Sequence, residues 1–432
     1  MPAATGRRPP RRHSRSATVV DAGAKGKGIL RAEAREEKGQ GQDHISDLPN
    51  DVLGDIVSRL PTKDGARTQV LSSRWHHIWR SAPLNLDLRF HRIPLSWIPC
   101  VLSSHRGPAR CFSTPECQWY CEELSYSAAT LDGLQEFDFG YDIPYGEWGD
   151  PPPLPASALR FSCTLRVARL WLCRFPDGIG INVRLPVLEE LQLSHCSISE
   201  SSLHALLDGC HALQKLWLTY NDGCSRVRIA SATLRSIDVG RGLGEFNLQQ
   251  VIIEDSPCLE RLHHDRPVAL GQPKKMMDIK VISAPKLGIL GDICDSFPRF
   301  EIGATVFKGL HVSTKAMVVH SVKVLSLSNT RLSLTLVLNF MKCFPAFIWI
   351  FQTLLFIGKK NVWDDKYCNL INTRDICLKK LVLTNYSGNE SHVNFVKFFV
   401  LNVKALETIR LVCQFTDARK DWIERQRSLL QF

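Results

Sequence analysis

The 432-residue chain lacks the short motifs by which most enzyme and metal sites are identified. It contains no G-x-S-x-G, no H-E-x-x-H, no phosphate-binding loop and no dinucleotide-binding glycine fingerprint. It also contains no C-x-x-C pair. Its one tight cysteine group (Cys111, Cys117 and Cys121, with His105 upstream) does not have the spacing of a structural zinc site. These absences predict a noncatalytic protein without a metal or other cofactor.

Long apolar runs are missing as well. The N-terminus is rich in arginine and has no apolar core, so we expect no secretory signal. The longest apolar run, 344–357, is interrupted by Pro345 and Gln352 and is shorter than the roughly 20 residues that cross a bilayer. Fifteen cysteines scattered through such a chain are most simply reduced thiols. We therefore expect a protein of the nucleus or cytoplasm that has no membrane partner.

Residues 1–42 have almost no large apolar side chains. Their ten basic and four acidic residues supply +6 of the chain's net charge of +11, so the rest of the chain is nearly balanced. This composition predicts a disordered basic tail. Arg7-Arg8 and Arg11-Arg12 fit an import signal, a contact with acidic polymers or simply a solvated tail. Aromatic residues do not alternate with these charges, which makes nucleic acid the least favoured partner.

Residues 44–80 predict three short helices. Asn50 is expected to cap the first, whose apolar stripe is Leu53, Ile56, Val57 and Leu60. Pro61 ends this helix because proline has no amide hydrogen to donate.

Two further caps follow in the same stretch. Thr62 is expected to cap the second helix, and Ser72 or Ser73 the third, which presents Trp75, Ile78 and Trp79 on one face. Fewer than forty residues cannot bury so many large apolar groups. Part of this surface is therefore expected to meet a partner.

The Leu48-Pro49 and Leu60-Pro61 steps and the run from Val70 to Trp75 resemble an F-box. The F-box is the module through which substrate receptors bind the Skp adaptor, and through it cullin, in ubiquitin ligases. The run of residues 61–75 further resembles plant proteins in which an F-box precedes leucine-rich repeats and an FBD segment. A generic helical hairpin with a tryptophan core is the alternative. The resemblance implies an adaptor-binding set of Leu48, Pro49, Leu53, Ile56, Leu60, Pro61, Val70, Leu71, Ser72 and Trp75.

A phrase with apolar residues at i, i+3 and i+5 then recurs. It occurs at Val167-Leu170-Leu172, Leu188-Leu191-Leu193, Leu213-Leu216-Leu218, Leu234-Ile237-Val239, Leu248-Val251-Ile253, Met276-Ile279-Val281, Val322-Leu325-Leu327, Leu378-Leu381-Leu383 and Leu406-Ile409-Leu411, with a weaker copy at Leu134-Phe137-Phe139. The first intervals are 21, 25 and 21 residues, within the leucine-rich-repeat range. With a capped helical stretch after Leu193 that turns Leu203, Leu206 and Leu207 inward, the pattern predicts a solenoid of alternating strands and helices.

The middle of this array is less regular. Later intervals vary from 14 to 56 residues, and the run 345–351 is apolar on both faces, so the repeat register between 240 and 372 stays open. An ordinary α/β domain with several such strands is the alternative fold.

Residues 377–411 resemble the FBD segment. They predict a strand, a polar turn at 386–390, a helix and a closing strand at 408–412. The apolar face of that helix is expected to be Val393, Val396, Phe399 and Val400. Together with a tail helix around Trp422 and Ile423, this unit is expected to cap the open end of the solenoid.

The predicted fold is therefore α/β: a leucine-rich-repeat solenoid preceded by a small all-α, three-helix F-box. We expect a tail at 1–42, the F-box at 43–90, irregular repeats at 91–372 and the FBD segment at 373–432. The resemblance implies the substrate-recognition subunit of an SCF-type E3 ubiquitin ligase, with a protein target that the sequence does not identify. The alternative is a repeat scaffold that acts without ubiquitin transfer.

Overall fold

A computed structural model describes residues 44–45, 47–87, 97–117, 131–141, 150–155, 158, 163–176, 184–241, 248–265, 277–294, 297–312, 317–328, 334–352, 377–413 and 420–430. The chain divides after Leu48 into a short N-terminal unit and a second unit, Pro49–Phe432. In the first unit the described residues form a turn, in which the Leu48 amide donates to the Ile45 carbonyl at 3.2 Å. The predicted disorder of residues 1–42 lies outside the described residues.

The second unit begins with the predicted helical module. It comprises α1 (Asn50–Ser58), α2 (Thr62–Arg67), the 3-10 turn η1 (Thr68–Val70) and α3 (Ser73–Ser81). The buried face of α1 presents Leu53 and Val57 to the side of α3 that carries Ile78 and Trp79. Burial of each such side chain contributes roughly 1.5–3 kcal/mol.

The predicted caps of the first two helices are wrong, and that of the third is correct in position only. Asn50 is the first residue of α1, and its side-chain oxygen accepts a hydrogen bond from Arg74 Nε at 2.8 Å instead. Thr62 begins α2, and its hydroxyl donates to the Asn85 carbonyl. Ser72 is the N-cap position of α3, but its side chain makes no capping hydrogen bond. For α1 and α2 the cap was predicted from local sequence, whereas a proline takes the N-cap position and the side chains of Asn50 and Thr62 bond to distant residues.

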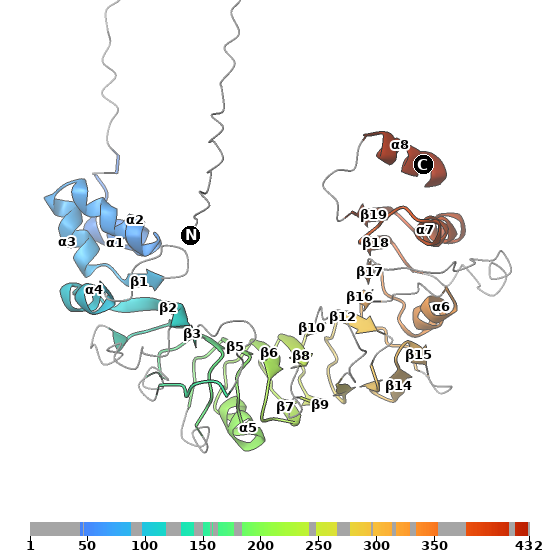
Figure 1. Ribbon diagram of the computed structural model, residues 1–432, viewed down its shortest axis with the longest axis horizontal. Coiled ribbons are helices and arrows are strands. Elements are labelled where there is room, and N and C mark those ends of the chain that lie inside the picture. The colour runs from blue at the N-terminus through green and yellow to red at the C-terminus, as the bar shows by residue number, and fades with distance from the viewer. Residues whose placement is uncertain are drawn as a thin grey trace, which may run out of the picture. The chain divides into compact units, whose positions relative to one another are not determined.

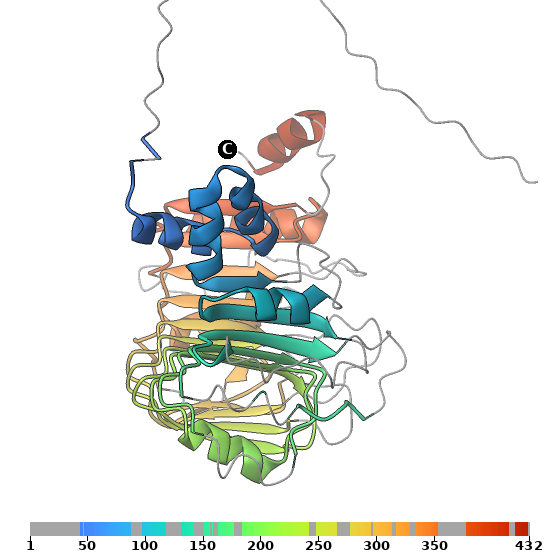
Figure 2. The ribbon, with the colours of Figure 1, turned by 90° about the vertical axis from the view of Figure 1, so that its left-hand side faces the viewer.

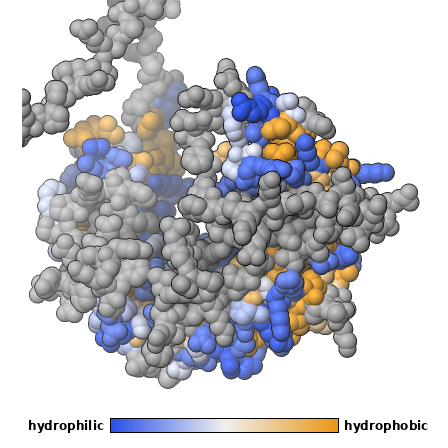
Figure 3. Space-filling model, turned by 45° about the vertical axis from the view of Figure 1, so that its right-hand side comes forward, coloured by the Kyte–Doolittle hydropathy of each residue, from blue (hydrophilic) through white to orange (hydrophobic). Residues whose placement is uncertain are grey.

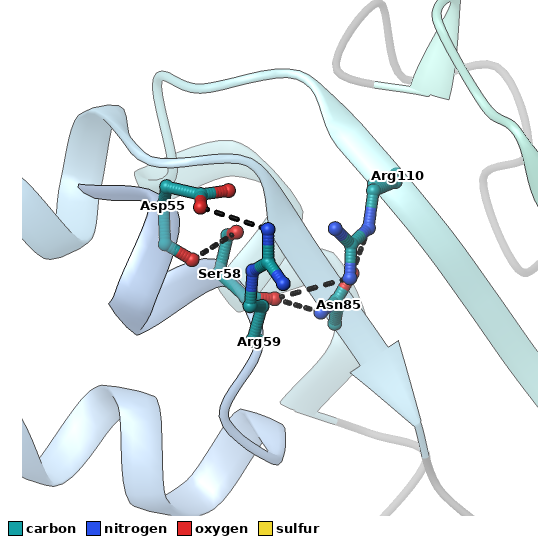
Figure 4. A network of polar contacts seen from close by, with 5 residues as sticks. All are labelled: Asp55, Ser58, Arg59, Asn85 and Arg110. Atoms are coloured by element: carbon teal, nitrogen blue, oxygen red, sulfur yellow. Dashed lines mark hydrogen bonds and ion pairs between the residues drawn. The ribbon is translucent and has the colours of Figure 1, made fainter. Parts of the chain in front are cut away.

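A polar network joins this module to the first strand of the following sheet, β1 (Leu84–Asp87) (Figure 4). Asn85 donates to the Ser58 carbonyl at the end of α1, and its side-chain oxygen accepts from Arg110 Nε at 3.1 Å. The Asp87 amide donates to the Thr62 hydroxyl at 3.1 Å. The Ser58 carbonyl thus accepts a hydrogen bond from Asn85 of β1, and the Asn85 carbonyl accepts one from Thr62 of α2, which fixes the module on the sheet.

The 13-stranded sheet carries the predicted repeats, and all of its neighbouring strands are parallel (Figures 1 and 2). After β1 its order is β2 (Ala109–Cys117), β3 (Glu136–Tyr141), β4 (Val167–Trp171), β5 (Glu190–Ser194), β6 (Lys215–Asn221), β8 (Ser236–Arg241), β10 (Arg261–Asp265), β12 (Ile289–Cys294), β16 (Val324–Ser328), β17 (Ile348–Gln352), β18 (Lys380–Thr384) and β19 (Thr408–Val412). Short α4 (Ile98–Ser104) precedes β2. The predicted α/β fold, a helical module followed by a leucine-rich-repeat sheet, is confirmed.

The i, i+3, i+5 phrase at β4 was predicted two residues too far toward the C-terminus. The buried residues are Leu165, Ala168 and Leu170, and Ala168 and Leu170 lie beside Leu191 and Leu193 of β5. Leu172 instead lies in the turn after β4, with φ at 49°. The true phrase was hidden because alanine takes the place of its middle leucine, while Val167 and Leu172 imitate the pattern.

Two predicted phrases belong to a different sheet. Residues 248–253 and 276–281 correspond to β9 (Gln250–Asp255) and β11 (Asp278–Val281) of a six-stranded sheet, although Met276 lies outside the described residues. The other members of that sheet are β7 (Arg226–Ala230), β13 (Phe300–Ile302), β14 (Thr305–Lys308) and β15 (His311–Val312). It lies on the same side of the long sheet as α5 (Glu200–Asp208), which contacts β7 (Figure 1).

The second sheet corrects the predicted alternation of strands and helices. Between β5 and β6 the return segment is α5, a capped helix as predicted, in which the Ser199 hydroxyl accepts from the Ser202 amide. Leu203 and Leu206 are buried as predicted, whereas Leu207 is partly exposed. From β7 onward the return segments are mostly strands, rich in valine and isoleucine. Branched side chains at Cβ favour extended backbone, which accounts for the change.

Three strands that the phrase search missed fill the irregular middle. In β10, His264 occupies the last leucine position of the phrase. It is buried, and its ring centre lies 4.7 Å from the centre of the Phe297 ring. In β12 the pairing shifts between Leu290 and Ile293. In β17 the buried residues are Ala346, Trp349 and Phe351, so the run 345–351 is one further repeat strand.

The C-terminal segment adds β18, α7 (Glu390–Asn402), β19 and α8 (Lys420–Leu430), preceded by α6 (Leu334–Cys343) after β16. Val393, Val396 and Phe399 of α7 are buried as predicted, whereas Val400 is only half-buried and Phe395, not predicted, is fully buried. The tail helix predicted around Trp422 and Ile423 is α8, in which Gln426 and Leu430 are buried while Ile423 is 39% exposed. The Tyr386 hydroxyl donates to Gln426 Oε1 at 2.8 Å, linking α8 to the loop before α7.

Candidate docking surfaces

The helical module exposes apolar side chains that its own core does not need. Val70 is 87% exposed and Leu71 65% exposed where η1 meets α3, and Ile56 on α1 is 43% exposed. Hydrophobic side chains lie beside hydrophilic ones on the described surface (Figure 3). Large aliphatic groups left in water at the end of a small helical module are typical of a protein interface.

The structure separates the predicted adaptor-binding residues into three groups. Exposed are Pro49, Ile56, Pro61, Val70, Leu71 and Ser72; half-buried are Leu48, Leu60 and Trp75; fully buried is Leu53. A partner cannot contact Leu53 in the folded module. Leu53 therefore supports the surface from inside, because it lies on the buried face of α1, the helix that presents Ile56.

One exposed residue of this surface was missed. Val52 of α1 is 44% exposed, although it lies outside the apolar stripe used to predict the helix. An apolar residue on the polar side of an amphipathic helix was the available signal.

The exposed residues rest on a close-packed interior. A Cβ atom added at Gly65 of α2 would lie 2.5 Å from the Trp79 ring, so only glycine fits there without movement. The Trp79 ring also packs edge-on against His105, with ring centres 5.4 Å apart. Burial lowers the pKa of His105, against the opposing effect of the hydrogen bond that its Nε2 makes with the Ala82 carbonyl at 2.8 Å.

The exposed face of the 13-stranded sheet is a second candidate surface. On its early strands the charged side chains pair with one another. Glu190 of β5 is in contact with Arg169 of β4 at 3.4 Å and with Lys215 of β6. Both cations are thus paired with the Glu190 carboxylate within the face.

A histidine bridges two carboxylates in the middle of the same face. His263 of β10 donates from Nδ1 to Asp238 of β8 at 3.1 Å and from Nε2 to Asp292 of β12 at 3.2 Å. The hydrogen bonds to Asp238 and Asp292 raise the pKa of His263 to about 9, against the opposing effect of partial burial. His263 is therefore charged at neutral pH.

The histidine also affects its neighbours. Although burial by itself raises the pKa of Asp292, hydrogen bonds from His263 and Ser326 hold it below its ordinary value. Asp238 and Asp292 both lie more than twenty residues from His263 along the chain. Only the strand register reveals the partners, which come from repeats on either side.

Within the described ranges, these surfaces are accompanied by neither a candidate metal site nor a membrane-spanning helix. No group of His, Cys, Asp and Glu side chains in the described ranges is placed to hold a metal ion, while Cys121 and the Cys117 side chain fall outside those ranges. In the same ranges, no helix is both long and apolar enough to cross a membrane.

A helical module with exposed apolar residues, followed by a long parallel sheet of LxxLxL strands, defines a leucine-rich-repeat protein with an N-terminal F-box. A family model described as "FBD-associated F-box protein At5g56370, LRR repeats" matches residues 125–347, and an F-box domain model matches residues 45–87. The chain belongs to the plant family of F-box/LRR/FBD proteins.

Curated relatives from Arabidopsis thaliana agree with this assignment. The chain is 28% identical over 275 residues to F-box/LRR-repeat protein At3g03360, a match that covers 57% of this chain and 52% of that protein. It is 26% identical to F-box protein At5g03100, over 60% of this chain and 80% of the relative. It is 30% identical to putative F-box/FBD/LRR-repeat protein At5g22610, over 46% of this chain and 42% of that protein. The matches thus span between about two-fifths and four-fifths of these relatives' lengths.

Proposed function

We propose that this chain is the noncatalytic substrate-recognition subunit of an SCF-type E3 ubiquitin ligase. In this proposal α1–α3 bind a Skp-type adaptor, and through it cullin, while the repeats hold a protein target. Transfer of ubiquitin is then accelerated because the target is held near the charged enzyme at a high effective concentration. Such a protein acts inside the cell, in the nucleus or the cytoplasm.

One observation carries the proposal. Val70 and Leu71 are the most exposed large apolar pair in the described F-box, and they follow each other between η1 and α3. The hydrogen bonds that join Ser58 (Figure 4) and Thr62 to β1 support the same function, because they hold the helices on the repeats without using the exposed residues. A receptor needs such a fixed link between adaptor and target.

The test is a paired pull-down with the full chain. Val70→Glu combined with Leu71→Glu places charge on the proposed interface and is expected to weaken adaptor binding about a hundredfold, the equivalent of roughly 3 kcal/mol. Leu48→Ala combined with Pro49→Ala is expected to have a similar effect. The matched control is Ile282→Glu with Met317→Glu, which charges two apolar residues that are 53% and 63% exposed outside the F-box.

Two results decide between receptor and scaffold. Folded F-box variants that recover the adaptor at wild-type affinity would refute the assigned interface. Wild-type protein that purifies with neither adaptor nor cullin would instead support a repeat scaffold that acts without ubiquitin transfer.

We propose the domain limits from the sequence analysis as they stand. Removal of residues 1–42 is expected to leave the melting temperature and adaptor binding unchanged. The segment 373–432 is proposed to close the solenoid, supported by the packing of α8 on α7 and on the Tyr386 loop. If an isolated 373–432 fragment unfolds cooperatively, this segment is an independent domain instead.

A further inference from the structure

The late strands of the 13-stranded sheet expose aliphatic side chains where the early strands expose charges. Ile289 of β12 is 41% exposed, and its register neighbours Val324 of β16 and Ile348 of β17 are partly exposed. One step along the strands, Ile350 of β17 lies beside Val382 of β18, and both are again partly exposed. These five residues form a continuous aliphatic area across four neighbouring strands.

The same area has a basic border. Lys380 follows Ile348 in register on β18, and Arg410 follows Val382 on β19. Within the described ranges, neither the Lys380 nor the Arg410 side chain has an ion-pair or hydrogen-bond partner. Lys323 supplies a third cation beside β16, with its Nζ 5.3 Å from the centre of the Phe347 ring.

Acidic side chains do not balance these cations. The strands β16, β17, β18 and β19 contain no aspartate or glutamate. Asp292 of β12 is already hydrogen-bonded by His263 and Ser326, and Glu407 pairs with Lys379 at 3.1 Å. A ligand of this face must therefore bring its own negative charge to neutralise Lys380 and Arg410.

We propose that this face (Ile289, Val324, Ile348, Ile350 and Val382 with Lys380 and Arg410) binds an extended acidic peptide segment in which carboxylates alternate with aliphatic residues. Four neighbouring strands span about 14 Å, the length of four to five extended residues. The aliphatic groups give the segment apolar contacts, and the two cations fix its direction. The proposal rests on the proposed function, since the segment would be part of the target protein.

The chemistry of the face favours a peptide over a nucleic acid. Single-stranded nucleic acids bind through aromatic platforms on which bases stack. The described exposed positions of this face are aliphatic, while Trp349 and Phe351 of β17 point into the core and are buried. An aliphatic surface beside two cations matches an acidic, apolar peptide better than a polyphosphate.

Fluorescence anisotropy on the full chain tests the proposal. The probe is a labelled 12-residue peptide that alternates glutamate with leucine, and its counterpart carries lysine at every glutamate position. We expect wild-type protein to bind the glutamate peptide at least tenfold more tightly than the lysine peptide. Lys380→Glu with Arg410→Glu, and separately Ile348→Ser with Ile350→Ser, are each expected to weaken binding of the glutamate peptide tenfold or more.

The matched control reverses the same amount of charge on the other sheet. Arg226→Glu with Lys308→Glu changes exposed cations of β7 and β14 and is expected to alter the affinity by less than twofold. Equal weakening by control and test variants, or no binding of the glutamate peptide to wild-type protein, overturns the proposal. A single-stranded oligonucleotide that displaces the peptide at lower concentration than the unlabelled peptide itself also overturns it.

Adaptor binding is measured on the same samples and separates this proposal from the proposed function. If the Lys380 and Arg410 variant loses peptide binding but still binds the adaptor, both this proposal and the proposed function are supported. If the wild-type protein binds the peptide but not the adaptor, the peptide-binding role of this face is supported and the ligase role is overturned.

Discussion

Strands β4–β6 and strands β16–β18 belong to one sheet and have the same buried face, yet their exposed faces differ. Inward, both sets bury large apolar side chains such as Leu191 and Leu381, which are 1% and 0% exposed. Outward, the early strands carry the ion pairs of Glu190, whereas the late strands carry aliphatic residues and the unpaired Lys380. The His263 bridge lies between the two regions.

The difference separates two requirements that act on one strand. The buried positions must fill the space between sheet and return segments, so their chemistry is the same wherever the repeat occurs. The exposed positions do not contribute to that filling, because hydrogen bonds between neighbouring strands already hold the sheet together. They are therefore free to differ between regions, and the difference is informative about binding.

The largest expected effect tests whether the buried faces are equivalent. Leu191→Ala and Leu381→Ala are each expected to lower the free energy of unfolding by about 2–5 kcal/mol, because each leaves a cavity between the sheet and its cover. Urea denaturation of both variants measures this, with Val382→Ala as the control for an exposed position. A loss below 1 kcal/mol at Leu381 alone would show that the late repeats are packed differently.

A second prediction concerns the His263 bridge between the regions. Because the folded pKa is about 9 and the unfolded value is 6.5, the folded protein binds the extra proton between these pH values. The stability from the bridge is therefore complete below pH 6.5 and is lost as pH rises through 9. His263→Gln is expected to cost roughly 1–3 kcal/mol at pH 7 and almost nothing near pH 10. Unfolding measured across this pH range should show the two curves converging.

A third prediction places the opposite pH dependence in the late region. Burial lowers the pKa of His392 in α7 to about 4, and its Nδ1 accepts a hydrogen bond from the Ser387 amide at 3.0 Å. Between pH 6.5 and 4 the unfolded chain binds the extra proton, so stability falls as the solution is acidified. The slope is expected to be about 1.4 kcal/mol per pH unit and to disappear in His392→Gln. An unchanged slope in that variant would assign the acid sensitivity to other groups.

The smallest expected effect compares the exposed charges directly. Glu190→Gln breaks the contacts with Arg169 and Lys215 and is expected to cost less than about 1 kcal/mol, with the cost declining at high salt. Lys380→Gln removes no contact and is expected to leave stability unchanged within about 0.3 kcal/mol. A clear loss of stability at Lys380 would mean that this cation has a structural partner and is not reserved for a ligand.

The sequence predicted the repeat where the phrase was intact and missed it where one residue was replaced. Leu188-Leu191-Leu193 and Leu213-Leu216-Leu218 lie in β5 and β6 as expected. The phrases of β10 and β17 were missed because a buried His264 and a bulky Trp349 occupy leucine positions. A ring can fill the volume of a leucine if its neighbours make room, and that room is visible only in three dimensions.

The candidate surfaces were predictable to different degrees. The helical module and most of its exposed residues followed from local signals, since helix stripes and proline stops act within a few residues. The aliphatic area on β12 and β16–β18 was not predicted, because its members come from segments more than twenty residues apart. Their proximity depends on a register that the irregular intervals did not reveal.

By itself, the sequence determined the helical module, the repeat period and the buried face of most strands, because these depend on short-range periodicity of apolar side chains. The tertiary structure alone decided which phrases joined the long sheet and which the second sheet. It also decided the register of β4 against β5 and the position of His263 between Asp238 and Asp292. Those outcomes depend on which strands become neighbours, and neighbouring strands here are held together by contacts between residues far apart in the chain.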